Sequence, residues 1–150
     1  MRVYLDLCCL KRPFDVQDQP LVRLQTEAVL SIQALPAGTA ELVRSQAQFL
    51  ENSLNPVRSR REAVDLWLSQ RPVAELPEAA LERRTAELLG LGFKNFDSFH
   101  IASAELARAS AFVTVDTRVL RTAARHAREL AVRVVDPIRF LEELPEWKPS

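Results

Sequence analysis

Glycine, cysteine and aromatic residues are scarce in this chain of 150 residues, which has 3 glycines, 2 cysteines and 7% aromatic side chains. No apolar stretch approaches the roughly 18 residues of a membrane-spanning helix, and carboxylates and a proline near the N-terminus are untypical of a signal peptide. The 20 basic residues are balanced by 20 acidic ones, which excludes a polybasic mode of holding nucleic acid. We therefore expect a cytoplasmic protein with no membrane segment and one domain over residues 1–150.

The two cysteines, Cys8 and Cys9, are adjacent in the sequence. A disulfide between neighbours is badly strained, and one vicinal pair does not make a disulfide framework. Two interpretations stay open. The thiols have a redox or metal-binding role, or they are two small side chains packed behind a strand end in a reducing compartment.

Short apolar segments alternate with segments of helical periodicity. Apolar, β-branched runs predict strands at residues 2–5, 41–43, 111–115 and 132–135. Helical spacing, prolines and capping residues predict helices at residues 21–35, 46–54, 55–69, 77–90, 95–110, 117–130 and from Pro137 onward. The segment after Pro13 reads as a polar loop. Because parallel strands need crossover connections, the pattern favours a small Rossmann-like α/β fold with three layers, in which helices flank a parallel sheet of four to five strands.

Three acidic residues stand where a strand ends or a helix begins. Asp6 follows the first predicted strand, Asp116 follows the third, and Asp97 opens a helix. Ligands of open α/β sheets bind beyond the carboxyl ends of the strands, so one crevice could collect all three. Asp97 and Asp116 could instead be helix N-caps. Asp6 lies among apolar neighbours and must be paired, hydrogen-bonded or metal-bound, and repulsion from Asp116 would call for a cation such as Mg²⁺ or Mn²⁺.

Two further residues are weaker candidates. Glu51 lies in the helix after the second predicted strand, where it is either a fourth acid of the site or a solvated glutamate. His100 comes three residues after Asp97 and shares its helix face, so it either completes an Asp/His metal pair or donates a hydrogen bond to a neighbour.

The sequence has no glycine-rich phosphate loop, no G-x-S-x-G or H-E-x-x-H motif, and no Cys/His cluster at zinc spacing. These absences argue against a dinucleotide-binding protein, a serine hydrolase and a zinc protease. A metal-dependent phosphatase on a similar sheet would need a nucleophilic aspartate with its own motif, and D-L-C-C gives that alternative poor support.

Two segments, VYLDLCCLKRPFD and FKNFDSFHIASAELARASAFVTVD, resemble the PIN domain family of metal-dependent ribonucleases, which includes VapC-type toxins. The resemblance extends over about residues 2–140, and the second segment is the more specific. Matched position by position, it implies four catalytic and metal-binding acids: Asp6, Glu51, Asp97 and Asp116. It implies that Asp6 and Asp97 bind Mg²⁺ or Mn²⁺ directly, and that the other two act through water or at a second metal site.

The family resemblance also implies a function. It implies an endoribonuclease that hydrolyses RNA, for example as the toxin of a toxin–antitoxin system, with an antitoxin and a homodimer as candidate assemblies. Two positions depart from the family pattern: Leu7 replaces a small hydroxyl residue, and Thr117 stands where a further acid often follows. The alternative is therefore a catalytically impaired PIN-like domain that binds RNA or a protein without cleaving RNA.

Arginine supplies 17 of the 20 basic residues. Arg118, Arg121, Arg125 and Arg128 are spaced by 3, 4 and 3 residues, which predicts one stripe of guanidinium groups on the helix after Asp116. Guanidinium groups suit bidentate contacts with phosphate, so Arg118, Arg121 and Arg125 are candidate substrate-binding residues. A second cluster contains Arg58, Arg60 and Arg61. Either group could instead be a solvated surface with acidic partners.

Overall fold

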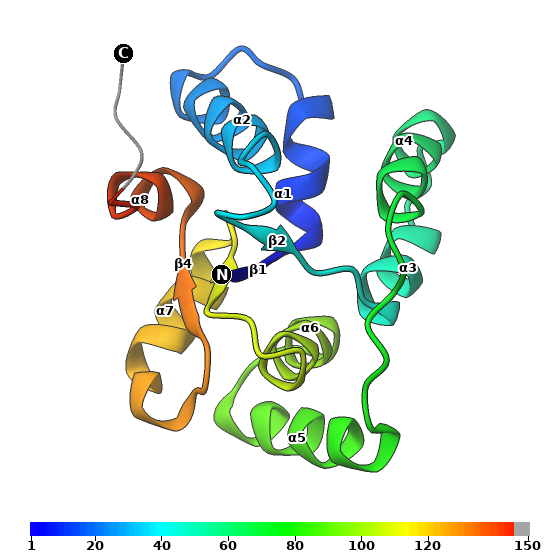
Figure 1. The fold of residues 1–150 in the computed structure, drawn as a ribbon, viewed down its shortest axis with the longest axis vertical. Helices are drawn as coiled ribbons and strands as arrows, with labels where there is room; N and C mark the ends of the chain where they lie inside the picture. The colour runs from blue at the N-terminus through cyan, green and yellow to red at the C-terminus, as the bar shows by residue number, and fades with distance from the viewer. Residues whose placement is uncertain (146–150) are drawn as a thin grey trace.

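The computed structural model describes residues 1–145. Within this range, four parallel strands form one sheet in the order β2-β1-β3-β4 (Figure 1). Its central strands are paired in the register Val3 to Ala111 and Leu5 to Val113. The strands are β1 (Arg2–Leu5), β2 (Glu41–Leu42), β3 (Ala111–Val113) and β4 (Arg133–Val135). The parallel sheet expected from the sequence is confirmed.

Helices cover both faces of this sheet. One face packs on α1 (Leu7–Lys11), α2 (Pro20–Gln33), α4 (Arg58–Leu68) and α8 (Pro137–Glu142). The other face packs on α5 (Glu78–Leu91), α6 (Asn95–Leu106) and α7 (Thr117–Arg125). A further helix, α3 (Gln46–Ser53), contacts α4 and α6 (Figure 1). None of the helices among residues 1–145 is both long and apolar enough to cross a membrane.

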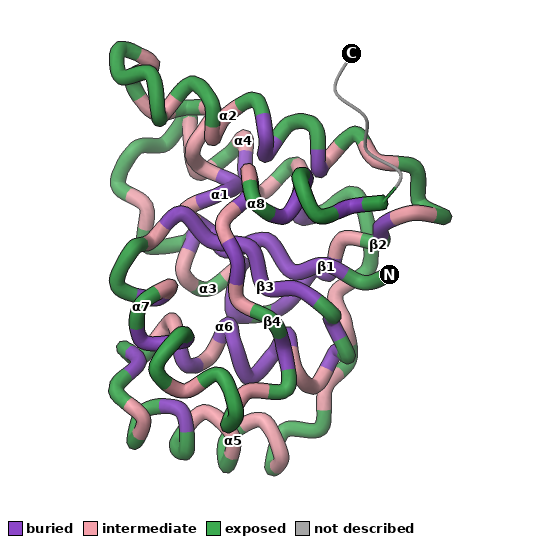
Figure 2. The backbone as a smooth tube through the Cα atoms, turned by 90° about the vertical axis from the view of Figure 1, so that its left-hand side faces the viewer, coloured by how far each residue is buried: buried purple, intermediate pink, exposed green. Residues whose placement is uncertain are grey.

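Strand β1 shows why the sheet needs two helical layers. Successive side chains of a strand point to opposite faces. Val3 and Leu5 accordingly lie in one buried cluster, and Tyr4 lies in the other. All three are fully buried, and Figure 2 shows the buried backbone running through the sheet and the inner side of α6. An apolar run without polar alternation is the signature of a strand covered on both faces.

Three of the differences from the sequence prediction concern helix α1 and the ends of α6 and α7. A five-residue helix, α1, follows β1 directly where no helix was predicted. Helix α6 ends at Leu106 and not near residue 110, because Arg108 adopts a left-handed backbone (φ 60°) that closes the last turn. Helix α7 ends at Arg125, and Arg128 lies in a separate 3₁₀ turn, Ala127–Glu129. The prediction that Arg128 extends the arginine stripe of this helix is therefore wrong.

Gly92 makes the turn that leads from α5 into α6. Its φ of +109° lies in the left-handed region, which L side chains rarely adopt. Gly90 lies two residues earlier inside α5, and a β-carbon added there would have no neighbouring atom within 4 Å. The two glycines therefore differ in backbone conformation and not in available space.

We expect Gly92→Ala to lower the free energy of unfolding by about 1–2 kcal/mol, because alanine is strained at positive φ. We expect Gly90→Ala to raise it by up to about 1 kcal/mol, because alanine is the better helix former. Urea denaturation of the two variants measures both effects. Equal changes of the same sign would contradict the assignment of the helix end to Gly92.

Candidate metal centre

Asp6 occupies the carboxyl end of β1 and is only 4% exposed. Its side chain caps α1 by accepting the Leu7 N–H at Oδ1, 2.8 Å away. The other oxygen, Oδ2, accepts hydrogen bonds from the Thr114 hydroxyl at 2.7 Å and from the Cys8 thiol at 3.3 Å. The buried carboxylate is therefore held in place by donors from two neighbouring strand ends.

Glu51 and His100 lie next to Asp6. One ligand atom from each of the three residues falls within 4.8 Å of the other two. Glu51 comes from α3 and is half-buried, whereas His100 comes from α6 and is fully buried. His100 Nε2 and Glu51 Oε1 are 3.0 Å apart. Glu51 is therefore not a solvated helix glutamate, and the three residues form a group that could bind a metal ion.

A chain of buried hydrogen bonds orients His100. The Tyr4 hydroxyl lies 2.5 Å from Ser45 Oγ and 2.6 Å from His100 Nδ1. The Glu51 carboxylate can only accept a hydrogen bond, so the proton that it shares with His100 lies on Nε2, and Nδ1 is an acceptor. Tyr4 therefore donates to Nδ1. This arrangement makes His100 a hydrogen-bond donor that positions Glu51.

Asp97 is the third residue of α6, and its carboxylate makes no hydrogen bond within the described residues. The N-cap of α6 is Lys94, so the capping interpretation of Asp97 is wrong. Burial raises the pKa of Asp97 from 3.8 to about 6, with further increases from the charges of Asp6 and Asp116. The charge of His100 opposes this increase. Asp97 is therefore a half-buried carboxylate that lies among other acids and accepts no hydrogen bond from the described residues.

Asp116 caps α7 as one of its two interpretations predicted. Its Oδ1 accepts the Arg118 N–H at 2.9 Å, and its own N–H donates to Thr114 Oγ1 at 3.1 Å. Thr114 thus links Asp116 to Asp6, since the same hydroxyl donates to Asp6. Capping does not use both carboxylate oxygens, so Asp116 keeps an oxygen for another ligand.

The carboxylate oxygens of this site suit a hard divalent cation as ligands. Asp97 and Asp116 fall outside the tight group of Asp6, Glu51 and His100, yet both Asp6 and Asp116 act on the pKa of Asp97. Carboxylate oxygens are the preferred protein ligands of Mg²⁺ and Mn²⁺. Burial and the neighbouring charges of Asp6 and Asp116 both raise the pKa of the unpartnered Asp97, and a bound cation would offset both effects.

The sequence did not identify every residue that shapes this site. His100 is not among the four acids that the family resemblance implies, although its spacing from Asp97 is a usable signal. Tyr4, Ser45 and Thr114 were missed, because Tyr4 and Thr114 lie in predicted strands and Ser45 precedes a predicted helix. Cys8 and Cys9 are free thiols, and Cys8 contacts Asp6.

Arginines line a pocket of about 210 Å³ beside Asp97. Its walls include Asp97 and Lys94 together with three residues of α7, namely Arg118, Arg121 and Arg125. The second arginine cluster has other partners: Arg58 pairs with Glu62, Arg60 with Asp15, and Arg61 with the Asn55 carbonyl. Of the two clusters, only the α7 arginines therefore adjoin the acids.

No protein-family model matches the chain, and no curated protein matches it. The chain is similar to a solved chain of VapBC-1 from nontypeable Haemophilus influenzae, with a TM-score of 0.58 and 16% identity over 91% of this chain and 98% of that chain. A chain of FitAcB from Neisseria gonorrhoeae gives a TM-score of 0.52 and 19% identity over 90% and 97% of the two chains. At these identities the likeness shows the fold alone. It confirms the PIN-like α/β fold expected from the sequence.

The raised pKa of Asp97 predicts a pH-dependent stability. The native state holds this proton more tightly than the unfolded chain, so the free energy of unfolding falls as pH rises from about 4 to about 6. Allowing for solvent screening, we expect a loss of about 1 kcal/mol that Asp97→Asn abolishes. Urea denaturation of the metal-free protein at pH 4.5 and 7.5 measures it, with Glu82→Gln on the exposed side of α5 as control. The same pH dependence in Asp97→Asn as in the wild type would contradict this assignment.

Proposed function

We propose that this protein is a metal-dependent endoribonuclease of the PIN domain family that acts in the cytoplasm. The observation that carries the proposal is the convergence of four acids on one edge of the sheet, with oxygens of Asp6 and Glu51 close enough to share an ion. The fold shared with the VapBC-1 chain and the sequence resemblance to PIN ribonucleases support the same assignment. The vicinal free thiols Cys8 and Cys9 suit a reducing compartment.

We assign Asp6 and Asp97 as direct ligands of Mg²⁺ or Mn²⁺, and Glu51 and Asp116 as acids that complete the site or act through water. When bound, the ion would lower the pKa of a water molecule and polarise the phosphate to be cleaved. His100 orients Glu51 through their 3.0 Å contact. A group that hydrogen-bonds to a carboxylate in this way fixes the direction in which the carboxylate presents its oxygens.

RNA needs positive charge beside the acids, because phosphate and carboxylate repel each other. Arg118, Arg121 and Arg125 supply it in the pocket that they share with Asp97. Guanidinium groups bind phosphate oxygens in bidentate fashion. With a formal net charge of zero, the chain relies on this local field, so substrate binding is expected to weaken steeply with salt.

The two departures from the family pattern leave a non-cleaving RNA- or protein-binding domain as the alternative. Leu7 is buried in the core and brings no hydroxyl to the site. A hydroxyl nevertheless contacts the same carboxylate, since Thr114 donates to Asp6 at 2.7 Å. Thr117 begins α7 and adds no acid beside Asp116. Because all four acids lie at the same sheet edge, the geometry favours the enzyme over the alternative.

We further propose an antitoxin partner, which would lay an apolar segment near the acids. Apolar side chains are exposed close to Glu51 in sequence, at Leu50, Leu54 and Val57. A homodimer through the helix that carries Trp67 has less support. In that helix Leu68 is buried and Trp67 stacks under Arg44, so of the three neighbouring apolar side chains only Leu66 is well exposed.

We expect the wild type to cleave single-stranded RNA in Mg²⁺ or Mn²⁺ and Asp6→Asn to lose more than about 100-fold in rate, since even changes to residues that only hydrogen-bond to metal ligands cost about 10- to 100-fold. Glu82→Gln removes one acid from the exposed side of α5 and is expected to cleave like the wild type. Cleavage is followed on a labelled RNA, with chelator added as a second control.

The outcome separates the two functions. Binding of RNA without metal-dependent cleavage by the folded wild type would favour the non-cleaving domain. Equal cleavage by wild type and Asp6→Asn would place the activity elsewhere or in a contaminant.

A further inference from the structure

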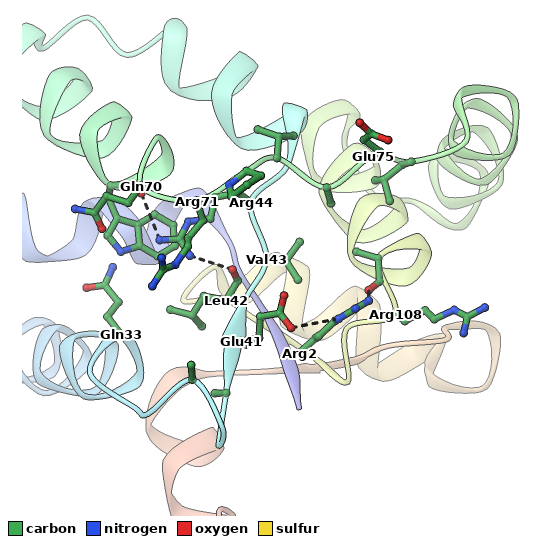
Figure 3. A pocket seen from close by; sticks show the side chains of 18 of the residues that line it. Arg2, Gln33, Glu41, Leu42, Val43, Arg44, Gln70, Arg71, Glu75 and Arg108 are labelled. Atoms are coloured by element: carbon green, nitrogen blue, oxygen red, sulfur yellow. Dashed lines mark hydrogen bonds and ion pairs between the residues drawn. The ribbon is translucent and has the colours of Figure 1, made fainter.

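A pocket of about 740 Å³ lies beside the edge strand β2 (Figure 3). Its walls come from the end of α2, from β2, from the end of α4 and from the segment 70–76. None of the four acids and neither histidine lines it. The pocket is therefore separate from the candidate metal centre.

A buried arginine without a carboxylate partner forms part of this pocket. Arg44 follows β2 and is 8% exposed. Its Nη1 donates to the Leu42 carbonyl at 3.0 Å, its Nη2 donates to the Trp67 carbonyl at 3.3 Å, and its guanidinium stacks 3.6 Å from the Trp67 ring centre. Its Nε is buried with no hydrogen-bond partner. Burying a cation without a counter-charge is costly, so an anion at this position would stabilise the structure.

A second arginine lies close to the first. Arg71 is exposed and makes no side-chain hydrogen bond or ion pair within residues 1–145. Burial lowers the pKa of Arg44 to about 10, and the charge of Arg71 contributes to this lowering. The two carboxylates of the pocket do not relieve this repulsion. Glu41 pairs with Arg2 at 3.6 Å, and Glu75 lies away from the two arginines in Figure 3.

Neutral donors gather at the same end of the pocket. Figure 3 shows Gln33 and Gln70 on the side where Arg44 and Arg71 lie. Neither amide makes a side-chain hydrogen bond within the described part of the chain. Two cations and two free amide groups thus face one space with no acid between them.

We propose that Arg44 and Arg71 form a binding site for a phosphate group. A phosphate or phosphomonoester carries a charge of about −1.5 to −2 at pH 7, which matches two guanidinium groups better than a single carboxylate does. Bidentate guanidinium contacts and the amides of Gln33 and Gln70 can serve its several oxygens. The phosphate comes either from the end of an RNA chain or from a free nucleotide.

A purely structural role explains only part of this arrangement. The two carbonyl contacts and the Trp67 ring show that Arg44 ties the end of α4 to β2. That role needs neither the unpartnered Nε nor a second arginine beside it. Substitution of Arg71, which makes none of these contacts, therefore tests ligand binding without disturbing the contacts of Arg44 with α4 and β2.

Trp67 provides a local reporter, because the chain has only two tryptophans and Trp147→Phe leaves Trp67 alone. In that background we would titrate potassium phosphate at constant ionic strength and follow Trp67 fluorescence. We expect a saturable change that becomes about tenfold weaker or more in Arg71→Gln, because a hydrogen bond between charged groups contributes at least that factor. Arg83→Gln, an exposed arginine of α5 that lines none of the pockets described, is expected to bind as before.

The controls decide between outcomes. No saturable change, unaltered binding by Arg71→Gln, or an equal response to acetate would overturn the phosphate assignment. Adenosine 5′-monophosphate and an RNA oligonucleotide with or without a 5′-phosphate then distinguish the sources. Competition by the 5′-phosphorylated oligonucleotide alone identifies an RNA end, and competition by the mononucleotide alone identifies a free nucleotide. The fluorescence readout requires no nuclease activity, so failure here leaves the proposed function untouched.

Discussion

The burial and mutual repulsion of carboxylates at one edge of the sheet are the constraint on which the candidate metal centre depends. Strands β1 and β3 are parallel neighbours, so Asp6 and Asp116 follow them at the same edge. Helices α3 and α6 bring Glu51 and Asp97 to the same place. The chain offsets the charge of Asp6 with three hydrogen-bond donors, but it gives Asp97 none. Burial and the charges of Asp6 and Asp116 together raise the pKa of Asp97 to about 6. A cation shared by the acids would relieve this repulsion.

Tyr4 connects this edge to the hydrophobic core. Its ring stacks on Phe112 of β3 with 5.3 Å between ring centres, and its hydroxyl joins Ser45 to His100. Burial raises the pKa of Tyr4 well above its ordinary value, so the hydroxyl keeps its proton and remains a donor. The direction in which Glu51 presents its carboxylate therefore depends on core packing. Rigid support of this kind behind the ligands is what a metal site needs to hold its geometry.

The sequence was sufficient to predict the layers of the fold and where the acids lie in it. Apolar runs such as residues 2–5 and 111–113 are local signals, and parallel topology then places Asp6 and Asp116 together. The hydrogen bonds of Tyr4 join residues 41 and 96 positions away, and no local pattern encodes such contacts. Helix α1 was missed because five residues are too few to show periodicity. Arg128 was assigned to the wrong element because no residue near Arg125 signals in the sequence that α7 ends there.

The central claim is that the acids share a divalent cation, and locating that cation tests it most directly. Crystals soaked in Mn²⁺ would be measured at a wavelength where manganese scatters anomalously. The account predicts an anomalous peak between Asp6 and Asp97, within about 2.0–2.6 Å of carboxylate oxygens as expected for hard cations. A well-ordered site with no peak at millimolar Mn²⁺, or a peak elsewhere in the molecule, would contradict it.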